Sequence, residues 1–405
     1  MKIFAILLVA STALLTANFA LAQTWTQTSA PSNVGWWGLA SSADGNKLVA
    51  VSTVGGVYTS TNAGAIWAQQ TNAPKLGVVA SSADGVKLAA GSFGGIYIGI
   101  YTSTNSGNTW TQQTNFPNIV AIASSADGVK LVTADFTEGI YTSTNSGAIW
   151  TPASPSNQFW FSLASSTDGT KLVAVGGNNL VGNNEIYLST NSGSSWIPAM
   201  LPVTDWQTVA SSADGTKLIA GDAGGGFGAY TSTNSGVTWI SNSVSPYSLY
   251  CSAVAMSADG SKMVAGVVVE GAFVPVSIYT STNSGATWQT NNAPYTYFRN
   301  TGTWKTVAAS ADFSKLVAVG GYSGWGIFTS QTTPSPQLNL TPSGSNLTAS
   351  WIIPSTNFVL QENLDLTTSN WTDVTNPPAL NLTNLQDEVV LSPTSSSGFY
   401  RLKTP

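Results

Sequence analysis

Carboxylates are the side chains through which this chain could perform acid–base chemistry, because histidine is absent and cysteine occurs once. The lack of His excludes imidazole metal sites and Ser-His or Cys-His catalysis. The one cysteine, Cys251, cannot form an intrachain disulfide and is expected to be a small buried apolar residue. Two carboxylates flanking a sugar ring are sufficient to hydrolyse a glycosidic bond. Cleavage of a polysaccharide is therefore the enzymatic activity to consider first.

Seven of the 18 acidic residues belong to a repeated element, so they are expected to be structural. The element reads SSADGNKL at 41, and its copies place their Asp at 44, 84, 127, 168, 214, 259 and 312. The mean period is about 45 residues, which is the length of a four-stranded propeller blade. Asp-Gly between two β-prone runs predicts a tight hairpin. Each period is thus expected to contain four antiparallel strands.

A polar decamer follows the hairpin in six of the periods. It reads YTSTNSGNTW at 101, and its copies carry Asn62, Asn105, Asn145, Asn191, Asn234 and Asn283. The Asn side chain can accept hydrogen bonds from nearby backbone N–H groups, and the Gly can adopt the left-handed conformation of a turn. The Trp that ends the decamer is a large apolar group suited to packing. The decamer is therefore expected to be a folding element.

The decamer resembles the Asp-box, S-x-D-x-G-x-T-W, with Asn in place of the usual Asp. Asp-box propellers include sialidases, xyloglucan-type glycoside hydrolases, sortilin-like receptors and photosystem II assembly factors, so the resemblance implies a β-propeller and leaves the function undecided. Sialidases of this family hold the substrate carboxylate with three Arg residues. This chain has two, and only Arg299 lies in the repeat region, the other being Arg401. A typical sialidase is thereby disfavoured.

The repeats predict an all-β chain with a seven-bladed β-propeller over residues 23–332, with six or eight blades as alternatives. The seventh period lacks a fourth strand, and QTWTQTSAPSN at 23 matches NTWTQQTNFPN at 108. The N-terminal segment is therefore expected to complete the last blade and remove its exposed edge.

The two ends of the chain carry different signals. Residues 1–22 have Lys2, an apolar run and an Ala-Leu-Ala ending, which predict a cleaved signal peptide and a secreted protein, extracellular or periplasmic. A membrane anchor is disfavoured because the apolar run is short. Residues 333–337, TPSPQ, predict a stiff linker. Residues 338–405 predict a small C-terminal β-sandwich-like domain, which resembles small C-terminal modules of secreted bacterial proteins.

Variation in loop length falls on the face opposite the hairpin and decamer turns, which is where binding residues usually lie. The carboxylates outside the hairpins also fall there. Asp135 and Asp222, each in a loop between a second and a third strand, are the pair that we predict to be catalytic if the protein is an enzyme. Otherwise these loop carboxylates are ordinary solvated charges.

Aromatic residues gather in the same loops and at the start of the inner strands. The candidates for ligand binding are Trp36, Trp160, Trp206, Trp304, Tyr297 and Trp325. The first four stand eight residues before a hairpin Asp, at the mouth of the expected central channel. They are expected either to stack on sugar rings or to wedge between blades.

The net charge of the chain limits the kinds of partner that it could bind. Without Lys2 the chain has 12 basic and 18 acidic residues, a net charge of −6, which argues against nucleic acid and anionic membranes. No later run is apolar enough to span a bilayer, no cofactor or metal motif is present, and a monomer is expected. Three functions stay open: a non-catalytic propeller that binds a polysaccharide or a protein, a polysaccharide-degrading hydrolase or lyase, and a cell-surface scaffold. Few charged residues remain outside the repeats, which favours the first.

Overall fold

The computed structural model describes residues 25–403, except for 53, 93–97, 137, 154–158, 178–183, 202–203, 224–227, 245–248, 270–276, 292–303, 321–325, 333–337, 344–345, 353–358, 366, 383–384 and 393–397. Strands and turns make up this part of the chain. The strands up to β28 form seven four-stranded antiparallel sheets within the described residues, and those from β29 onward form two further sheets. The predicted signal peptide and the predicted linker lie outside the described residues.

Each of the first six sheets is built from four consecutive strands. The first contains β2 (Gly38–Ser41), β3 (Leu48–Ser52), β4 (Gly56–Ser60) and β5 (Ala68–Gln70), the second β6 (Val78–Ser81), β7 (Leu88–Gly91), β8 (Ile100–Ser103) and β9 (Thr111–Gln112), and the third β10 (Ile119–Ser124), β11 (Leu131–Asp135), β12 (Gly139–Ser143) and β13 (Thr151–Pro152). The fourth contains β14 (Phe159–Ser165), β15 (Leu172–Gly177), β16 (Asn184–Ser189) and β17 (Ile197–Pro198), the fifth β18 (Trp206–Ser211), β19 (Leu218–Asp222), β20 (Gly228–Ser232) and β21 (Ile240–Ser243), and the sixth β22 (Leu249–Met256), β23 (Met263–Val269), β24 (Ser277–Ser281) and β25 (Gln289–Asn291).

The last sheet of the ring joins the two ends of the repeat region. It contains β26 (Trp304–Ala309), β27 (Lys315–Gly320), β28 (Ile327–Gln331) and, from the N-terminal segment, β1 (Trp25–Gln27). Strand β1 pairs antiparallel with β28, with Trp25 opposite Ser330. The last sheet also contacts the first, since Thr306 Oγ1 donates to Trp37 O at 3.2 Å.

Backbone hydrogen bonds run around the ring at its hairpin end. In each one, the N–H of a residue just before a hairpin Asp donates to the carbonyl of the matching residue in the next sheet, over 2.7–2.8 Å. The participants are Ala43, Ala83, Ala126, Thr167, Ala213, Ala258 and Ala311, and the N–H of Ala311 returns to the carbonyl of Ala43. This circle of bonds ties all the described sheets of the ring into one closed body.

The hairpin aspartates stabilise their own turns by accepting hydrogen bonds from neighbouring residues. In the third sheet, Asp127 Oδ1 accepts from the Ser125 hydroxyl and from the Val129 N–H. Burial alone would raise the pKa of Asp127, but these hydrogen bonds and the positive charge of Lys87 together lower it below its usual value. The structural role predicted for these aspartates agrees with these contacts.

Lysines brace one hairpin to the next. Lys47 Nζ, for example, donates to Asp84 O at 2.9 Å in the following sheet. Its stem also passes so close to Gly85 that a Cβ there would lie 2.8 Å from Lys47 Cβ. Gly85 has φ +67, so glycine is required both by the turn and by the packed lysine.

The decamer turns lie beside the hairpins of the same sheet. Ser106 N donates to Val86 O at 2.8 Å, which places both turns of the second sheet on one face, as the sequence predicts. Asn105 Oδ1 accepts from Thr109 N at 2.9 Å, while Asn105 Nδ2 donates to Thr109 Oγ1 at 2.9 Å. An aspartate could not donate this second bond, so the amide suits a decamer in which Thr or Ser stands four residues after the Asn.

Two residues of each decamer have a positive φ, whereas the sequence predicts a positive φ for the glycine alone. Ser106 has φ 56 and Gly107 φ 87, and the other decamers repeat this pair. The Ser103 hydroxyl accepts from Gly107 N at 3.0 Å and holds the second of them. The decamer Trp is half-buried and packs at the boundary with the preceding sheet, as Trp110 does against a cluster that includes Val49 and Val51.

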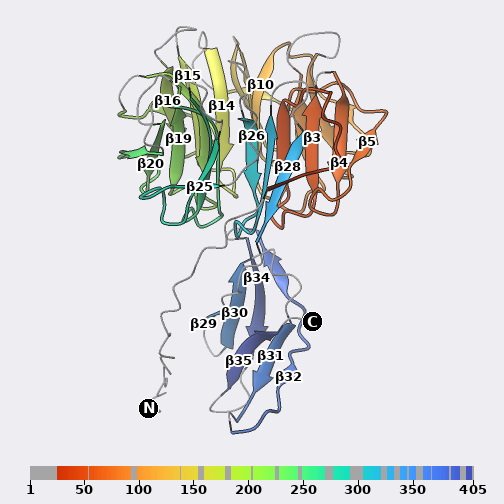
Figure 1. Ribbon diagram of the computed structural model, residues 1–405, viewed down its shortest axis with the longest axis vertical. Helices are drawn as coiled ribbons and strands as arrows, with labels where there is room; N and C mark the ends of the chain where they lie inside the picture. The colour runs from red at the N-terminus through yellow and green to blue at the C-terminus, as the bar shows by residue number, and fades with distance from the viewer. Residues whose placement is uncertain are drawn as a thin grey trace.

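The remaining strands form two sheets beyond the ring, which we call the C-terminal sheets (Figure 1). One contains β29 (Asn339–Ser343), β30 (Asn346–Ile352), β34 (Gln386–Leu391) and β33 (Ala379–Asn381), and the other β32 (Thr372–Asp373), β31 (Val359–Asn363) and β35 (Phe399–Lys403). Their shared core is built around Trp351, with Ala349, Leu360, Val389 and Leu391 buried against it.

Candidate functional site

In every sheet of the ring, a fully buried residue stands within two residues of the start of the inner strand. These residues are Trp36, Leu76, Ile119, Trp160, Trp206, Cys251 and Trp304, each 0% exposed. The four tryptophans contact an aromatic ring of the third strand edge-on, as Trp206 does with Tyr230 at 4.9 Å and 80°. They pack against the preceding sheet, Trp206 lying among Val173, Val175 and Ile186.

This burial argues against the alternative in which these four tryptophans stack on sugar rings. A side chain with no exposed surface cannot contact a ligand, and the same position holds Leu76 and Ile119 in other sheets. The wedge interpretation fits instead. Cys251 occupies the position in the sixth sheet, where burial raises the pKa of its thiol to about 12, so it behaves as the small apolar residue expected from the sequence.

Asp135 and Asp222 are also buried, at 0% and 2% exposure. Asp135 accepts from the backbone N–H groups of Asn118 and Glu138, both at 3.1 Å, and Asp222 accepts from the Thr204 hydroxyl at 2.8 Å. In the first sheet the matching residue is Ser52, whose hydroxyl accepts from Gly55 N at 2.9 Å. Asp135 thus anchors backbone at this end of the sheet, whereas Asp222 is held by a side-chain hydroxyl. Their burial argues against the predicted catalytic role, and the two belong to the third and fifth sheets.

The accessible side chains stand one residue further along the inner strands. In five sheets the pairing register shifts just after the buried residue, leaving one extra residue unpaired. A β-bulge of this kind redirects a side chain, and bulges are frequent beside functional sites. The extra residues are Val120, Phe161, Gln207, Ser252 and Lys305, and Trp37 has the matching place in the first sheet. We call these six residues the inner rim.

The inner rim differs from the buried residues beside it in both exposure and chemistry. Trp37 is 46% exposed, Lys305 is exposed, and the other four are half-buried. Lys305 Nζ lies 5.1 Å from the centroid of the Trp37 ring, so the two span the boundary between the last and first sheets. The Ser252 hydroxyl instead donates to Trp304 O at 2.8 Å and links the sixth sheet to the last.

Further aromatic rings extend the inner rim at the third and fourth sheets. Phe136 directly follows Asp135, and its ring lies 5.2 Å from Phe159 and 6.3 Å from Phe161. All three are half-buried. The inner rim is therefore apolar and aromatic at the third and fourth sheets. Among the six rim residues, Lys305, in the last sheet, is the one cation.

The inner rim was not predicted from the sequence, although the repeats contain a signal for it. The rim residues stand seven positions before each hairpin Asp, and the second sheet has Gly77 there. The position four residues before the hairpin Asp is Ala in every repeat, whereas the rim position varies from Trp to Lys to Val. A repeat does not need such variation to fold. The remaining predicted site residues, Tyr297 and Trp325, lie outside the described residues.

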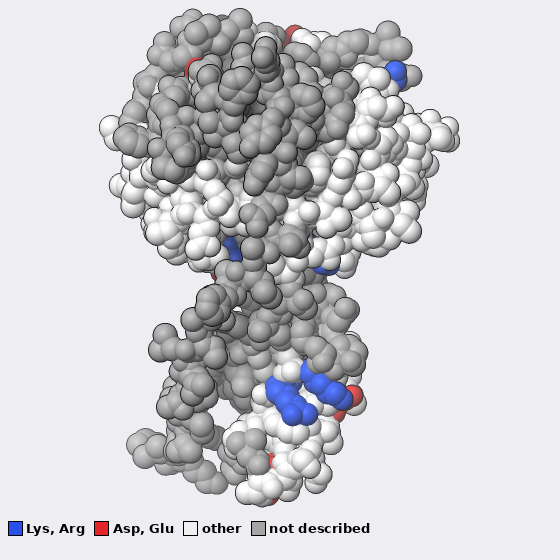
Figure 2. Space-filling view, viewed as in Figure 1, with Lys and Arg blue, Asp and Glu red and all other residues white. Residues whose placement is uncertain are grey.

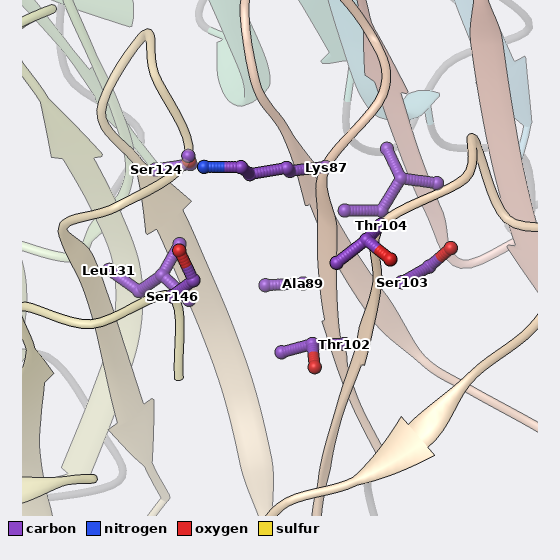
Figure 3. Close-up of a pocket in the computed structure, with 10 residues that line it drawn as sticks. Lys87, Ala89, Thr102, Ser103, Thr104, Ser124, Leu131 and Ser146 are labelled. Carbon is purple, nitrogen blue, oxygen red and sulfur yellow. The ribbon is translucent and has the colours of Figure 1, made fainter. Parts of the chain in front are cut away.

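The spaces between neighbouring sheets are too small for a ligand. Figure 3 shows one between the second and third sheets, lined by Lys87, Ala89, Thr102 and Ser146. Its volume is about 10 Å³, which is room for roughly one water molecule. A larger cavity of about 190 Å³ lies at the hairpin end of the ring.

Charged side chains are sparse on the surface of the ring. Only 8% of the residues in the chain are Asp, Glu, Lys or Arg. In the view of Figure 2, the described surface of the ring is almost entirely uncharged, and the largest patch of Lys and Arg lies on the C-terminal sheets. A ligand held at the ring therefore meets few charges.

Comparison with known proteins identifies the fold alone. No protein-family model matches the chain, and no curated protein matches its sequence. Solved structures do match. A GH74 xyloglucanase from Xanthomonas campestris aligns with 15% identity and a TM-score of 0.59, covering 82% of this chain and 59% of the enzyme. The chain has a β-propeller fold.

Two other solved propellers also align with the chain. YCF48 bound to D1 peptide aligns with 16% identity and a TM-score of 0.56, covering 77% of this chain and 97% of its own. The Cps50 (Swd1) β-propeller domain of Myceliophteria thermophila aligns with 11% identity and a TM-score of 0.56, covering 76% of this chain and all of its own. The fold of the chain is thus similar both to that of an enzyme and to that of a propeller with a bound peptide. Among the described residues no helix has the length and apolar character needed to cross a membrane.

Proposed function

We propose that this protein is a secreted, non-catalytic β-propeller that binds a neutral or weakly charged polysaccharide through its inner rim and the loops beside it. The observation that carries the proposal is the row of inner-strand bulges, because each presents a different side chain at the same place on a nearly uniform scaffold. Aromatic rings such as Trp37 and Phe161 suit the apolar faces of sugars. A protein segment is the second candidate ligand, since YCF48 holds a peptide.

The architecture proposed with this function is a seven-bladed propeller of the Asp-box type over residues 23–332. The sheets, the closing strand β1 and the decamer hydrogen bonds support it. Residues 333–337 form a linker and residues 338–405 a small β-sandwich-like domain in this proposal. The first 22 residues act as a signal peptide, which takes the protein to the periplasm or the cell exterior as a monomer. Tyr297 and Trp325 stay further candidate contacts in this proposal.

The polysaccharide hydrolase is the weaker alternative. The GH74 neighbours show that the fold can carry glycoside hydrolysis, but at 14–15% identity they share only the fold with this chain. Asp135 and Asp222 would have to reach the sugar, but both are buried, Asp135 accepting from backbone N–H groups and Asp222 from the Thr204 hydroxyl. A surface scaffold that holds no defined ligand is the remaining alternative.

The rim can be tested by substitution. We expect the mature protein to bind one or more neutral polysaccharides on a glycan array, and Trp37→Ala to weaken that binding about tenfold or more, as loss of a central aromatic contact does. Ile66→Ala is the matched control, because Ile66 is 67% exposed and follows a decamer turn at the opposite face. Affinities are measured by calorimetry with the polysaccharide that the array identifies. Equal affinities of wild type and Trp37→Ala would exclude the inner rim as the binding surface.

A further inference from the structure

The cavity at the hairpin end of the ring is lined by a repeated set of small residues. Each of the first five sheets supplies a half-buried serine to it, namely Ser41, Ser81, Ser124, Ser165 and Ser211. The circle of backbone-bonded residues from Ala43 to Ala311 lines it as well. The cavity is therefore the hairpin-end mouth of the central channel.

The polar groups of this mouth are already paired. The N–H of each circle residue donates to the carbonyl of the next, and those carbonyls accept. The serine hydroxyls donate to the carbonyl of the residue that follows them, as Ser124 does to Ser125 O at 2.8 Å. The side chains that the backbone-bonded residues contribute to the wall of the cavity are mostly alanine methyl groups. The donors of this opening are thus used, and its alanine methyl groups give an apolar side chain a surface to contact.

One residue from beyond the ring lines the same cavity. Leu385, in the turn between β33 and β34, is the lining residue that the C-terminal sheets contribute. Its N–H donates to Asn381 O at 2.9 Å, and the residue is half-buried. Figure 1 shows the C-terminal sheets below the ring, and β34 begins directly after Leu385. The turn therefore meets the mouth of the channel.

The backbone of Leu385 points to a role for its side chain. Its φ is +56, a left-handed conformation that costs a non-glycine residue about 1 kcal/mol or more. Glycine at this position would form the turn at a lower cost. A leucine side chain that contacts the alanine and serine side chains of the mouth offsets that cost by burying apolar surface.

The hairpin of the last sheet is buried, which indicates that the hairpin end of the ring is covered at this sheet. Ala311, Asp312 and Ser314 are 5%, 4% and 3% exposed. In the second and third sheets the matching Asp84 and Asp127 are exposed. Thr332, where the chain leaves the ring, donates from its N–H to Ser314 O at 2.7 Å. The route to the C-terminal sheets thus begins on this hairpin.

We propose that the C-terminal sheets close the hairpin-end mouth of the central channel, with Leu385 seated in the opening. The channel is then accessible only from the inner rim. This inference is independent of the ligand, since it concerns a contact within the chain and holds whether or not a polysaccharide binds.

Thiol labelling of the full chain tests the closure. Ser165→Cys places a thiol in the mouth with little change in size, and the native Cys251 is fully buried with a raised pKa, so it contributes little background. We expect the new thiol to react slowly with a maleimide, and at least about tenfold faster when Leu385→Asp is added, because a buried carboxylate disfavours the seated turn.

Two further variants keep the result interpretable. Leu382→Asp is the matched control, because Leu382 is 39% exposed in the same turn and should leave the labelling rate unchanged. Leu385→Gly removes the side chain while permitting the positive φ, so it should also speed labelling without disturbing the turn. The proposal is overturned if Ser165→Cys reacts as fast in the otherwise unmodified chain as in either Leu385 variant.

Discussion

Removal of residues 23–33 will lower the melting temperature of the protein by at least about 5 °C, measured by circular dichroism or calorimetry. The deletion removes β1, which covers the outer edge of β28 through the pairs Trp25–Ser330 and Gln27–Phe328. Trp25 is only 9% exposed and packs with Trp304 and Phe313. Loss of a buried tryptophan alone costs about 3–5 kcal/mol, and each kcal/mol lowers the melting temperature of a large domain by about 2 °C or more.

The deletion also affects the boundary between the last and first sheets. Trp36 Nε1 donates to Pro31 O at 3.1 Å, and Ala30 is buried in the cluster around Trp36. The exposed edge of β28 would in addition favour association between chains. Thr26→Ala is the control, because Thr26 is an exposed residue of the same strand. A truncated protein that melts at the wild-type temperature would show that β1 does not close the ring.

Substitution of Trp206 by alanine should destabilise the fold by about 3–5 kcal/mol, as expected for a fully buried aromatic side chain. If Trp206 instead stacked on a sugar ring, the substitution would weaken binding and leave the fold intact. The difference comes from burial, since Trp206 is 0% exposed and contacts Tyr230 edge-on at 4.9 Å. Denaturant unfolding measures the loss of stability, and calorimetry at low temperature measures the affinity of the fraction that remains folded.

Trp206→Phe keeps an aromatic ring in the same core and should recover more than half of the lost stability. The affinity for ligand should be the same in the wild type, the alanine variant and the phenylalanine variant. A Trp206→Ala protein of wild-type stability that no longer binds ligand would place this side chain in the binding site, contrary to its burial in the structure.

The all-β fold and its repeated four-stranded sheets could be predicted from the sequence because each repeat encodes its turns locally. Asp-Gly specifies the hairpin through a positive φ, and the decamer Asn and Gly specify the second turn through side-chain hydrogen bonds. Such signals lie within a few residues of one another. Seven copies of the hairpin and six of the decamer then make a chance match very improbable.

The candidate site could not be predicted in the same way, because it depends on contacts between sheets. Trp304 and Lys305 are adjacent in sequence, yet one is fully buried against the sixth sheet and the other reaches Trp37 in the first. A one-residue bulge decides which of them is exposed. The role of Asp135 escapes prediction for a related reason, since only the register shows that it stands where Ser52 anchors the loop of the first sheet.

Binding without cleavage is tested most directly by incubating the wild-type protein with the polysaccharide that it retains and then measuring reducing ends and chain length. We expect the polysaccharide to be bound and recovered at its original length, with Asp135→Asn and Asp222→Asn proteins behaving like the wild type once their stability is matched by temperature. Release of reducing sugar by the wild type that is abolished by either substitution would contradict the non-catalytic function and establish a glycoside hydrolase.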